Sequence, residues 1–518
     1  MTAARLELWS FREDVHVETD QDTGWLTLHG RWDDVRLPPQ RPAIREALRR
    51  MTLGPIRLEN VLADPADRTA LARLLECCAA MVVRSVGFGP DELVLSVVPL
   101  TPQARFLPVE PDPGRPVRLS RFATLTTDGS SYRLESPLSL HRVVLHGRRA
   151  VWLLSALGAP VLPEKVAAPP LTDLLGHLLA AGMVVAAESP EPPARFAEDE
   201  DPVLASWAPL DLMFHTRTTL GRHDGDYGAT YPGGDREPDE PVVVPAAGPS
   251  VALPRPGWAR VLAHDPPLSA VLEAPPGSPH FPSTPPTARD LGELLYRAAR
   301  VRTLSRPADR PRAELSERPY PSSGGCYPFE LYVVVHRCTG LARGVYHYDP
   351  LGHRLELLPT AGAAELLDAA AIAANLPGRP PLLIVVTARF RRLWWKYGGL
   401  GYVLALKDLG LLVRSLSMVA TAIGLRARPA DGGDIQCAAR VLGTDWRAES
   451  SLAALAVGMP DEHPEGPYEH CGGRCEHRDG RYKDRGGRLE RRPRNGADWP
   501  ARAAARLAQA WRARSGLG

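Results

Sequence analysis

Residues 321–335 read PSSGGCYPFELYVVV, and this stretch decides the fold of the C-terminal half of the chain. Its second part, FELYVVV at 329–335, is almost continuously apolar, which predicts a strand buried on both faces of a sheet. The preceding Ser322, Ser323, Gly324 and Gly325 have little side-chain bulk. Because glycine has no Cβ, such a loop can press its backbone N–H groups against a flat or anionic ligand. A plain tight turn before a strand is the alternative that the spacing alone leaves open.

Further runs follow at strand and helix lengths. GVYHYDPLGHRLELL at 344–358 predicts a hairpin that turns at 349–352. PLLIVVTARF at 381–390 predicts another buried strand, and the residues from Tyr402 to Gly424 predict one long apolar helix.

The composition excludes several classes of protein. At roughly 100–200 residues per domain, 518 residues suggest two to four domains. The 62 basic and 60 acidic residues leave a formal charge of +2, which argues against a nucleic-acid binder. The 7 cysteines are scattered and odd in number, so a reduced compartment is expected. The charged N-terminus and the lack of any long apolar stretch predict a soluble, cytoplasmic protein without a membrane partner.

The N-terminal half predicts two smaller units. In the first, 1–110, WLTLHGRW predicts a strand and IREALRRMTLGPI a helix. DRTALARLLECCAAMVVRSV at 67–86 predicts a longer helix that starts at Asp67 or Thr69. The second unit, 116–190, predicts a hairpin turning at Asp128-Gly129, a helix over 141–157, and a helix that gives way to a strand at Gly182. This order is typical of a winged-helix unit, and a generic α/β piece is the alternative.

The remaining segments are polar. An extended connecting segment is expected at 205–260, and a charged tail with a C-terminal helix at 461–518. The tail holds His470-Cys471-x-x-x-Cys475-x-His477, whose thiols and imidazoles could bind zinc. The flanking histidines are too cramped for a usual zinc finger. We therefore predict no metal site.

Taken in order, the motifs resemble the SagB-type thiazole/oxazole-forming dehydrogenases, a branch of the FMN-dependent nitroreductase-like family. The resemblance covers roughly 205–460. It implies an α+β fold, in which a nitroreductase-like FMN-binding domain at 265–460 has an antiparallel-type central sheet and flanking helices and follows winged-helix-like N-terminal units. The motifs are DLMFHTRTTLGR (211–222), RPYPSSGGCYPFELYVVV (318–335), GVYHYDP (344–350), KYGGLGYVLALKDLG (396–410) and A-x-x-x-GL (420–425).

The resemblance also implies an activity. Such enzymes bind FMN and oxidise azoline rings of a ribosomally made precursor peptide to azoles, as hydride passes to flavin N5 and a base removes the adjacent proton. The family's Lys-Tyr pair, linked to proton removal, falls on Lys396 and Tyr397. Two tryptophans, Trp394 and Trp395, precede the lysine and could shield it from water, which suits a general base; a packed surface lysine is the alternative. The residues expected to bind FMN are Arg318, Ser322, Ser323, Gly324, Gly325, Gly432 and Gly433.

Partners follow from the same resemblance. We expect a homodimer, because the family builds its flavin site across two subunits. We also expect a precursor peptide whose leader is held by the 116–190 unit through strand addition, and a cyclodehydratase partner.

One departure from the family pattern affects the cofactor. Pro275, Pro276, Gly277 and Ser278 stand where arginines usually hold the FMN phosphate by charge-assisted bonds. Either other arginines compensate, or FMN binds weakly, or the chain is a flavin-free scaffold that binds leader peptide and partner enzymes. A nitroreductase-like enzyme acting on a small molecule is a third reading, against which the long N-terminal part argues. The candidate compensating arginines are Arg300, Arg302, Arg318 and Arg474.

Overall fold

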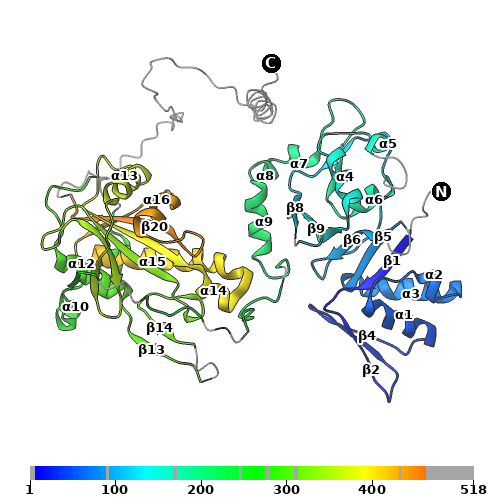
Figure 1. Ribbon diagram of the computed structural model, residues 1–518, viewed down its shortest axis with the longest axis horizontal. Coiled ribbons are helices and arrows are strands. Elements are labelled where there is room, and N and C mark those ends of the chain that lie inside the picture. The colour runs from blue at the N-terminus through cyan, green and yellow to red at the C-terminus, as the bar shows by residue number, and fades with distance from the viewer. Residues whose placement is uncertain are drawn as a thin grey trace, which may run out of the picture. The chain divides into compact units, whose positions relative to one another are not determined.

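The computed structural model describes most of the chain up to residue 461 (Figure 1). Hydrophobic cores form separately around residues 11–82, 86–184 and 253–457. Among the described residues, none of the helices has the length and apolar character needed to cross a membrane. The described ranges are 6–88, 93–127, 129–166, 172–223, 225–234, 236, 238–243, 248–275, 280–308, 313–430 and 433–461.

A six-stranded antiparallel sheet takes strands from both predicted N-terminal units. Its order is β1-β5-β6-β10-β9-β8, and a separate three-stranded sheet has the order β2-β3-β4. The strand β3 confirms the strand predicted in WLTLHGRW, and the pairing of β8 with β9 confirms the hairpin, although Asp128 lies outside the described residues. The bounds are β1 Leu6–Phe11, β2 His16–Thr19, β3 Leu26–His29, β4 Asp34–Leu37, β5 Val82–Gly87, β6 Leu93–Pro99, β8 Thr124–Thr127, β9 Tyr132–Glu135 and β10 His141–Leu145.

Three helices and one 3-10 turn lie between β4 and β5: α1 (Pro42–Leu53), α2 (Leu58–Val61), α3 (Pro65–Cys77) and η1 (Ala79–Met81). Helix α1 confirms its prediction. The predicted start of α3 was wrong, because the Asp64 side chain accepts a hydrogen bond from Ala66 N and Pro65 takes the first helical position. The prediction that this helix runs to Val86 was also wrong. Its last residues carry β-branched side chains and form β5 instead.

The middle of the chain adds a two-stranded sheet and short helices. The predicted helix over 141–157 was wrong in its first half, since 141–145 form β10 and Gly147, at φ +78°, separates this strand from α4. Gly182, at φ +67°, ends α6 before β11, as predicted. The bounds are β7 Val117–Leu119, α4 Arg148–Ala156, α5 Pro163–Val166, α6 Thr172–Ala180, β11 Val184–Ala186, α7 Ala197–Glu200, α8 Pro202–Ala205 and α9 Pro209–Arg217.

The C-terminal part is built on a seven-stranded antiparallel sheet in the order β12-β17-β16-β15-β18-β20-β19. Every residue of β15 is buried, and the strand lies in the middle of the sheet, as FELYVVV predicted. The hairpin over 344–358 is confirmed as β16 and β17. The bounds are β12 Ser250–Ala252, β15 Phe329–Val335, β16 Gly344–Asp349, β17 Arg354–Leu357, β18 Leu382–Arg389, β19 Arg426–Ala430 and β20 Glu449–Gly458, with a separate pair β13 Thr303–Ser305 and β14 Leu315–Glu317.

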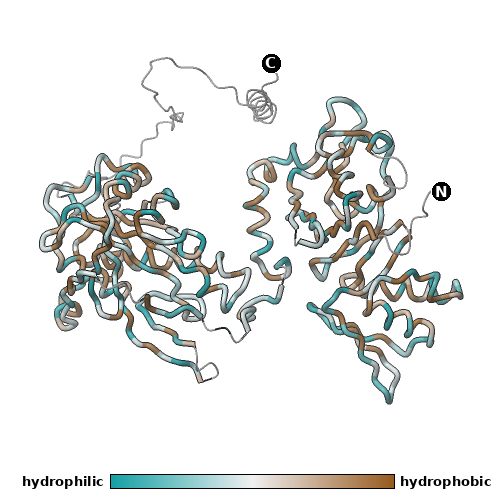
Figure 2. Tube along the Cα trace, viewed as in Figure 1, coloured by the Kyte–Doolittle hydropathy of each residue, from teal (hydrophilic) through white to brown (hydrophobic). Residues whose placement is uncertain are grey.

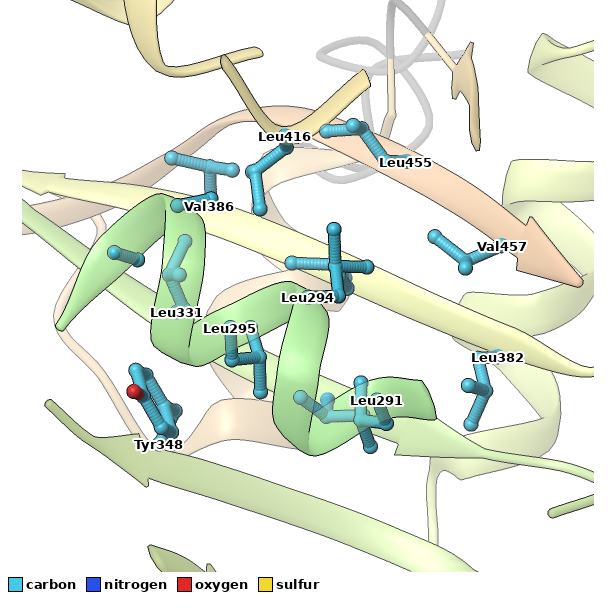
Figure 3. Close-up of a cluster of buried hydrophobic side chains, with 14 of the residues drawn as sticks. Leu291, Leu294, Leu295, Leu331, Tyr348, Leu382, Val386, Leu416, Leu455 and Val457 are labelled. Atoms are coloured by element: carbon cyan, nitrogen blue, oxygen red, sulfur yellow. The ribbon is translucent and has the colours of Figure 1, made fainter. Parts of the chain in front are cut away.

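Helices cover both faces of this sheet, which explains the continuous apolar runs of its strands. On one face, α12 (Ala288–Ala299) and α15 (Gly401–Ala422) pack against the sheet (Figure 3). On the other face lie α13 (Ala363–Ala373) and α16 (Ile435–Leu442). The central strands are mostly hydrophobic in Figure 2. Helix α15 confirms the predicted long helix. The remaining bounds are α10 Trp258–His264, α11 Leu268–Leu272, η2 Ser323–Gly325, α14 Phe390–Tyr397 and η3 Gly398–Leu400.

Candidate active site

The Ser-Ser-Gly-Gly loop lies at the entrance of the central strand β15. Gly324 has φ +55° and Gly325 has φ +70°, both in the left-handed region that glycine adopts without strain. The two glycines therefore turn the backbone sharply between Ser323 and Cys326. A plain tight turn would have the same shape, so the approach of this backbone to a ligand stays a prediction.

The loop is held in place by the side chain of Asp408, a residue of α15 that is 3% exposed. Its carboxylate accepts hydrogen bonds from Ser322 Oγ at 2.8 Å, from Ser323 N at 2.7 Å and from Ser323 Oγ at 2.8 Å. Ser322 Oγ in turn accepts from Tyr327 N at 3.0 Å. Sequence reasoning missed Asp408. The available signal was a single acid in the buried stripe of an otherwise apolar helix.

The predicted Lys396-Tyr397 pair meets this loop. Lys396 Nζ donates to Gly324 O at 3.0 Å and lies 5.7 Å from the centre of the Tyr397 ring. A Cβ added at Gly324 would lie against Tyr397 Oη and 2.6 Å from Lys396 Nζ. The structure therefore brings together four of the predicted cofactor-binding residues and both predicted catalytic residues, although they are about 70 positions apart in sequence.

The two tryptophans that precede Lys396 differ in their burial. Trp395 is buried and its Nε1 donates to Arg236 O at 2.8 Å, whereas Trp394 is 44% exposed. Burial raises the pKa of the Tyr397 hydroxyl, and the nearby acidic groups Cys326, Tyr231 and Asp408 add to the rise. Tyr397 is thus a hydrogen-bond donor at neutral pH. Burial also raises the pKa of the Cys326 thiol to about 11, so this cysteine is a packed neutral thiol.

Three buried arginines hold the segment 239–241 over this region. Arg318 Nη2 donates to Pro241 O at 2.8 Å, Arg389 Nη1 donates to Glu240 O at 2.8 Å, and Arg392 Nη1 donates to Asp239 O. Glu330, which is 1% exposed, forms ion pairs with Arg389 at 2.9 Å and with His347 at 3.1 Å. Arg318 was predicted to bind the cofactor, but its guanidinium is 4% exposed and is engaged with two backbone carbonyls, the second that of Phe329 at 3.3 Å.

Replacing Arg392 with methionine is expected to lower the free energy of unfolding by about 2–5 kcal/mol, because the carbonyls of Cys326 and Asp239 would be left buried without a donor. Calorimetric unfolding of the full chain measures this loss. The matched control is Arg391→Met on the same helix. Arg391 is exposed and contacts Asp239 only at 3.6 Å, so its loss is expected to cost less than about 0.5 kcal/mol. Equal unfolding temperatures for the two variants would contradict the structural role of Arg392.

A cavity in the C-terminal part lies apart from the loop. It has a volume of about 560 Å³ and a mainly apolar lining. Gly433 lines it, while Gly432 lies outside the described residues. Neither Lys396 nor the 322–325 loop lines it, so the predicted site residues fall into two groups within one chain. The lining residues include Ala370, Val385, Phe390, Tyr402, Leu406, Gly433, Ile435, Ala438, Trp446 and Ser451.

The other arginines proposed to replace the missing phosphate ligands line neither the 322–325 loop nor the 560 Å³ cavity where the structure describes them. Arg300 and Arg302 line a separate pocket of about 220 Å³ together with Arg255 and His353. Arg474 lies outside the described residues, as do Pro276, Gly277, Ser278 and the His470–His477 cluster. In the described ranges, no group of histidine, cysteine or acidic side chains could hold a metal ion.

Comparison with known proteins adds the family. Residues 280–459, which contain six of the seven strands of the sheet, the loop and the Lys-Tyr pair, match the model of the nitroreductase family. The C-terminal part of this chain is a nitroreductase-family domain. Residues 117–224 match a second model, that of the cyanobactin oxidase ThcOx. The matched region begins at β7 and extends through α9, so it precedes the nitroreductase-family domain in the chain.

Two curated relatives are homologous to the chain. The microcin B17-processing protein McbC of Escherichia coli is 30% identical over 146 residues, which are 27% of this chain and 54% of McbC. The trifolitoxin-processing protein TfxB of Rhizobium leguminosarum bv. trifolii is 28% identical over 175 residues, which are 33% of this chain and 46% of TfxB. The chain thus spans about half the length of these curated relatives. These homologies confirm the resemblance to the SagB-type dehydrogenases.

A solved structure is also similar to part of this chain. It is the E. coli microcin synthetase McbBCD complex with truncated pro-MccB17 bound. The matching chain is 26% identical with a TM-score of 0.32, and the match covers 37% of this chain and 70% of that chain.

Proposed function

We propose that this chain is an FMN-dependent azoline dehydrogenase that oxidises thiazoline or oxazoline rings of a ribosomally synthesised precursor peptide. The observation that carries the proposal is the hydrogen bond from Lys396 Nζ to Gly324 O, which joins the family's Lys-Tyr pair to the predicted flavin loop. The homology of this chain to McbC and TfxB supports a precursor peptide as the substrate class.

The reaction removes a hydride from one ring carbon and a proton from its neighbour. Bound FMN would supply the hydride acceptor, which no side chain offers. Lys396 would take the proton, since its amine lies in the last turn of α14 and is held at the Gly324 carbonyl. The Tyr397 phenol, which keeps its own proton at neutral pH, would donate a hydrogen bond to the ring or relay the proton.

The described residues fit the ring system of FMN better than its phosphate. Members of the nitroreductase family bind FMN. A cavity of about 560 Å³ lies within the range of cofactor sites, and its apolar lining suits a flat aromatic ring. A Cβ built on Gly433 would meet nothing within 4 Å, so a ligand could approach this backbone closely. We propose that Gly433 and the 322–325 loop hold the ring, whereas Arg318 has no free face for the phosphate.

A homodimer would unite the two groups of site residues. Around the cavity, four large apolar side chains remain 39–47% exposed: Tyr402, Leu406, Ile435 and Trp446. Such a cluster on the surface marks an interface. We propose that a second copy covers it and brings its own 322–325 loop and Lys396 to the cavity. Each flavin would then sit between two chains.

The N-terminal region is proposed to hold the leader of the precursor. β8 is an edge strand of the six-stranded sheet and is mostly exposed, so its backbone can pair with an added strand of peptide. This proposal keeps the winged-helix-like, peptide-recognising role expected for 116–190. The cyclodehydratase partner, which would make the azoline, and the cytoplasmic location also remain proposals.

One observation favours a second candidate, a flavin-free scaffold that binds leader peptide and partner enzymes. Arg318 is buried, and its guanidinium donates to two backbone carbonyls. In this conformation it cannot also bind a phosphate.

The absorbance spectrum of the purified full chain tests the proposal. We expect the visible flavin bands at near-stoichiometric occupancy after incubation with FMN and desalting. Riboflavin, which lacks the phosphate, is the matched control: equal retention of both would mean that the phosphate is not gripped. A protein that stays colourless after FMN and desalting would overturn the dehydrogenase proposal and put the scaffold first.

A further inference from the structure

Asp408 is an unusual residue for its position. Helix α15 buries one stripe of side chains against the domain, and its other members are Gly401, Ala405, Leu412, Leu416 and Ala420. An ionised carboxylate in such a stripe is costly unless donors compensate its charge. A role in packing alone would be filled better by leucine. The carboxylate therefore requires an explanation at the atoms that it contacts.

Among the described residues, the donors that reach Asp408 all belong to the Ser-Ser-Gly-Gly loop. Two serine hydroxyls and the Ser323 N–H donate to it at 2.7–2.8 Å. Within the described part of the chain, no arginine or lysine lies within ion-pair distance of it. The charge of Asp408 is thus balanced by the loop itself. Each serine hydroxyl has a single proton and uses it in the hydrogen bond to Asp408. The two hydroxyls can therefore only accept hydrogen bonds from a ligand.

We propose that Asp408 is a positioning residue for Lys396. Asp408 pins Ser322 and Ser323, this anchor fixes the left-handed turn at Gly324, and the Gly324 carbonyl then holds the lysine amine at 3.0 Å. Without the anchor, the two glycines would sample many backbone conformations and the carbonyl would lose its place. The role in proton removal rests on the proposed function, but the coupling between Asp408 and Lys396 does not.

Two substitutions separate position from charge. Asparagine can retain the contacts: its Oδ1 accepts from Ser322 and from Ser323 N–H, while its Nδ2 donates to a rotated Ser323 hydroxyl. Asp408→Asn therefore keeps the loop and removes the charge. Asp408→Ala removes both. If positioning is the role, the conservative variant rescues what alanine loses.

The experiment measures how fast an amine-reactive reagent acylates Lys396 in the full chain, followed by peptide mass spectrometry over a range of pH. Lys407, which is exposed on the same helix as Asp408, serves as the internal reference. We expect Asp408→Ala to speed the labelling of Lys396 relative to Lys407 by roughly two- to tenfold, because the amine loses one hydrogen bond. Asp408→Asn is expected to stay within about twofold of the unmodified chain, given that one hydrogen bond is at stake.

Two results would overturn the inference. Unchanged labelling in Asp408→Ala would show that the carboxylate does not govern the lysine, and equal labelling in Asn and Ala variants would show that charge rather than position matters. If the alanine variant fails to fold, Ser323→Ala releases the loop with Asp408 in place and is expected to accelerate labelling, and Ser415→Ala on α15 is its matched control. The labelling needs neither flavin nor peptide, so it stands or fails separately from azoline oxidation.

Discussion

Lys396→Ala is expected to lower the rate of azoline oxidation by about 10²–10⁴-fold, the usual contribution of a general base, and to leave any bound flavin spectrum unchanged. The reason is geometric: the amine lies at the Gly324 turn, beside Tyr397, and no other lysine or histidine of the described residues forms a hydrogen bond with this loop. The measurement follows the loss of two hydrogens per ring from an azoline-containing peptide by mass spectrometry.

Two further variants sharpen this test. Lys396→Arg keeps a cation that can donate to the Gly324 carbonyl, but a guanidinium stays protonated and cannot act as a base. It should therefore be as inactive as the alanine variant while the loop stays in place. Lys407→Ala, which removes an exposed lysine of α15, should oxidise peptide at the normal rate. Loss of flavin together with activity in Lys396→Ala would instead make Lys396 a cofactor-binding or structural residue.

Gly324→Ala carries the second large effect. Its φ of +55° is costly for a residue with a Cβ, by roughly 1–2 kcal/mol. The new methyl group would in addition collide with Tyr397 Oη and lie 2.6 Å from Lys396 Nζ, so both predicted catalytic groups would have to move. Because a displacement of about 1 Å can cost about 10²-fold in rate, we expect a loss of that size in turnover.

Gly325→Ala is the matched control for this prediction. Gly325 has a similar φ of +70°, but a Cβ there would meet nothing within 4 Å. It should share the backbone strain of Gly324→Ala, and so the fall in thermal stability, but leave Lys396 and Tyr397 in place. If both variants lose activity equally, the collision with the Lys-Tyr pair is not the cause, and strain in the loop would explain both.

The sequence predicted the C-terminal domain better than the N-terminal half. The buried strand at 329–335, the hairpin and the helix from 401 have strong periodic patterns, and the structure confirms each of them. The errors at 82–87 and 141–145 have one cause. Both segments are short, apolar and joined to a true helix, so periodicity alone could not separate strand from helix.

The candidate site was predictable only in part. The convergence of Lys396 with the 322–325 loop followed from the family motifs, and the hydrogen bond to Gly324 supports it. Asp408 was not predictable, because its partners are more than 80 positions away in sequence. The same holds for Arg318, which looked like a phosphate ligand on the chain. Only the fold reveals that its guanidinium is buried and donates to the backbone carbonyls of Pro241 and Phe329.

Segment 239–241, which is held by three buried arginines, limits where the nitroreductase-family domain can be truncated. Its residues precede the first long helix of the domain, yet they carry the carbonyls that Arg318, Arg389 and Arg392 need. A fragment beginning at residue 265 would also lack β12, the edge strand of the central sheet. A stable fragment that carries the nitroreductase-family domain therefore has to begin before residue 239, in the stretch that follows the cyanobactin oxidase match, so the two matched regions are not cleanly separable by truncation or by domain exchange.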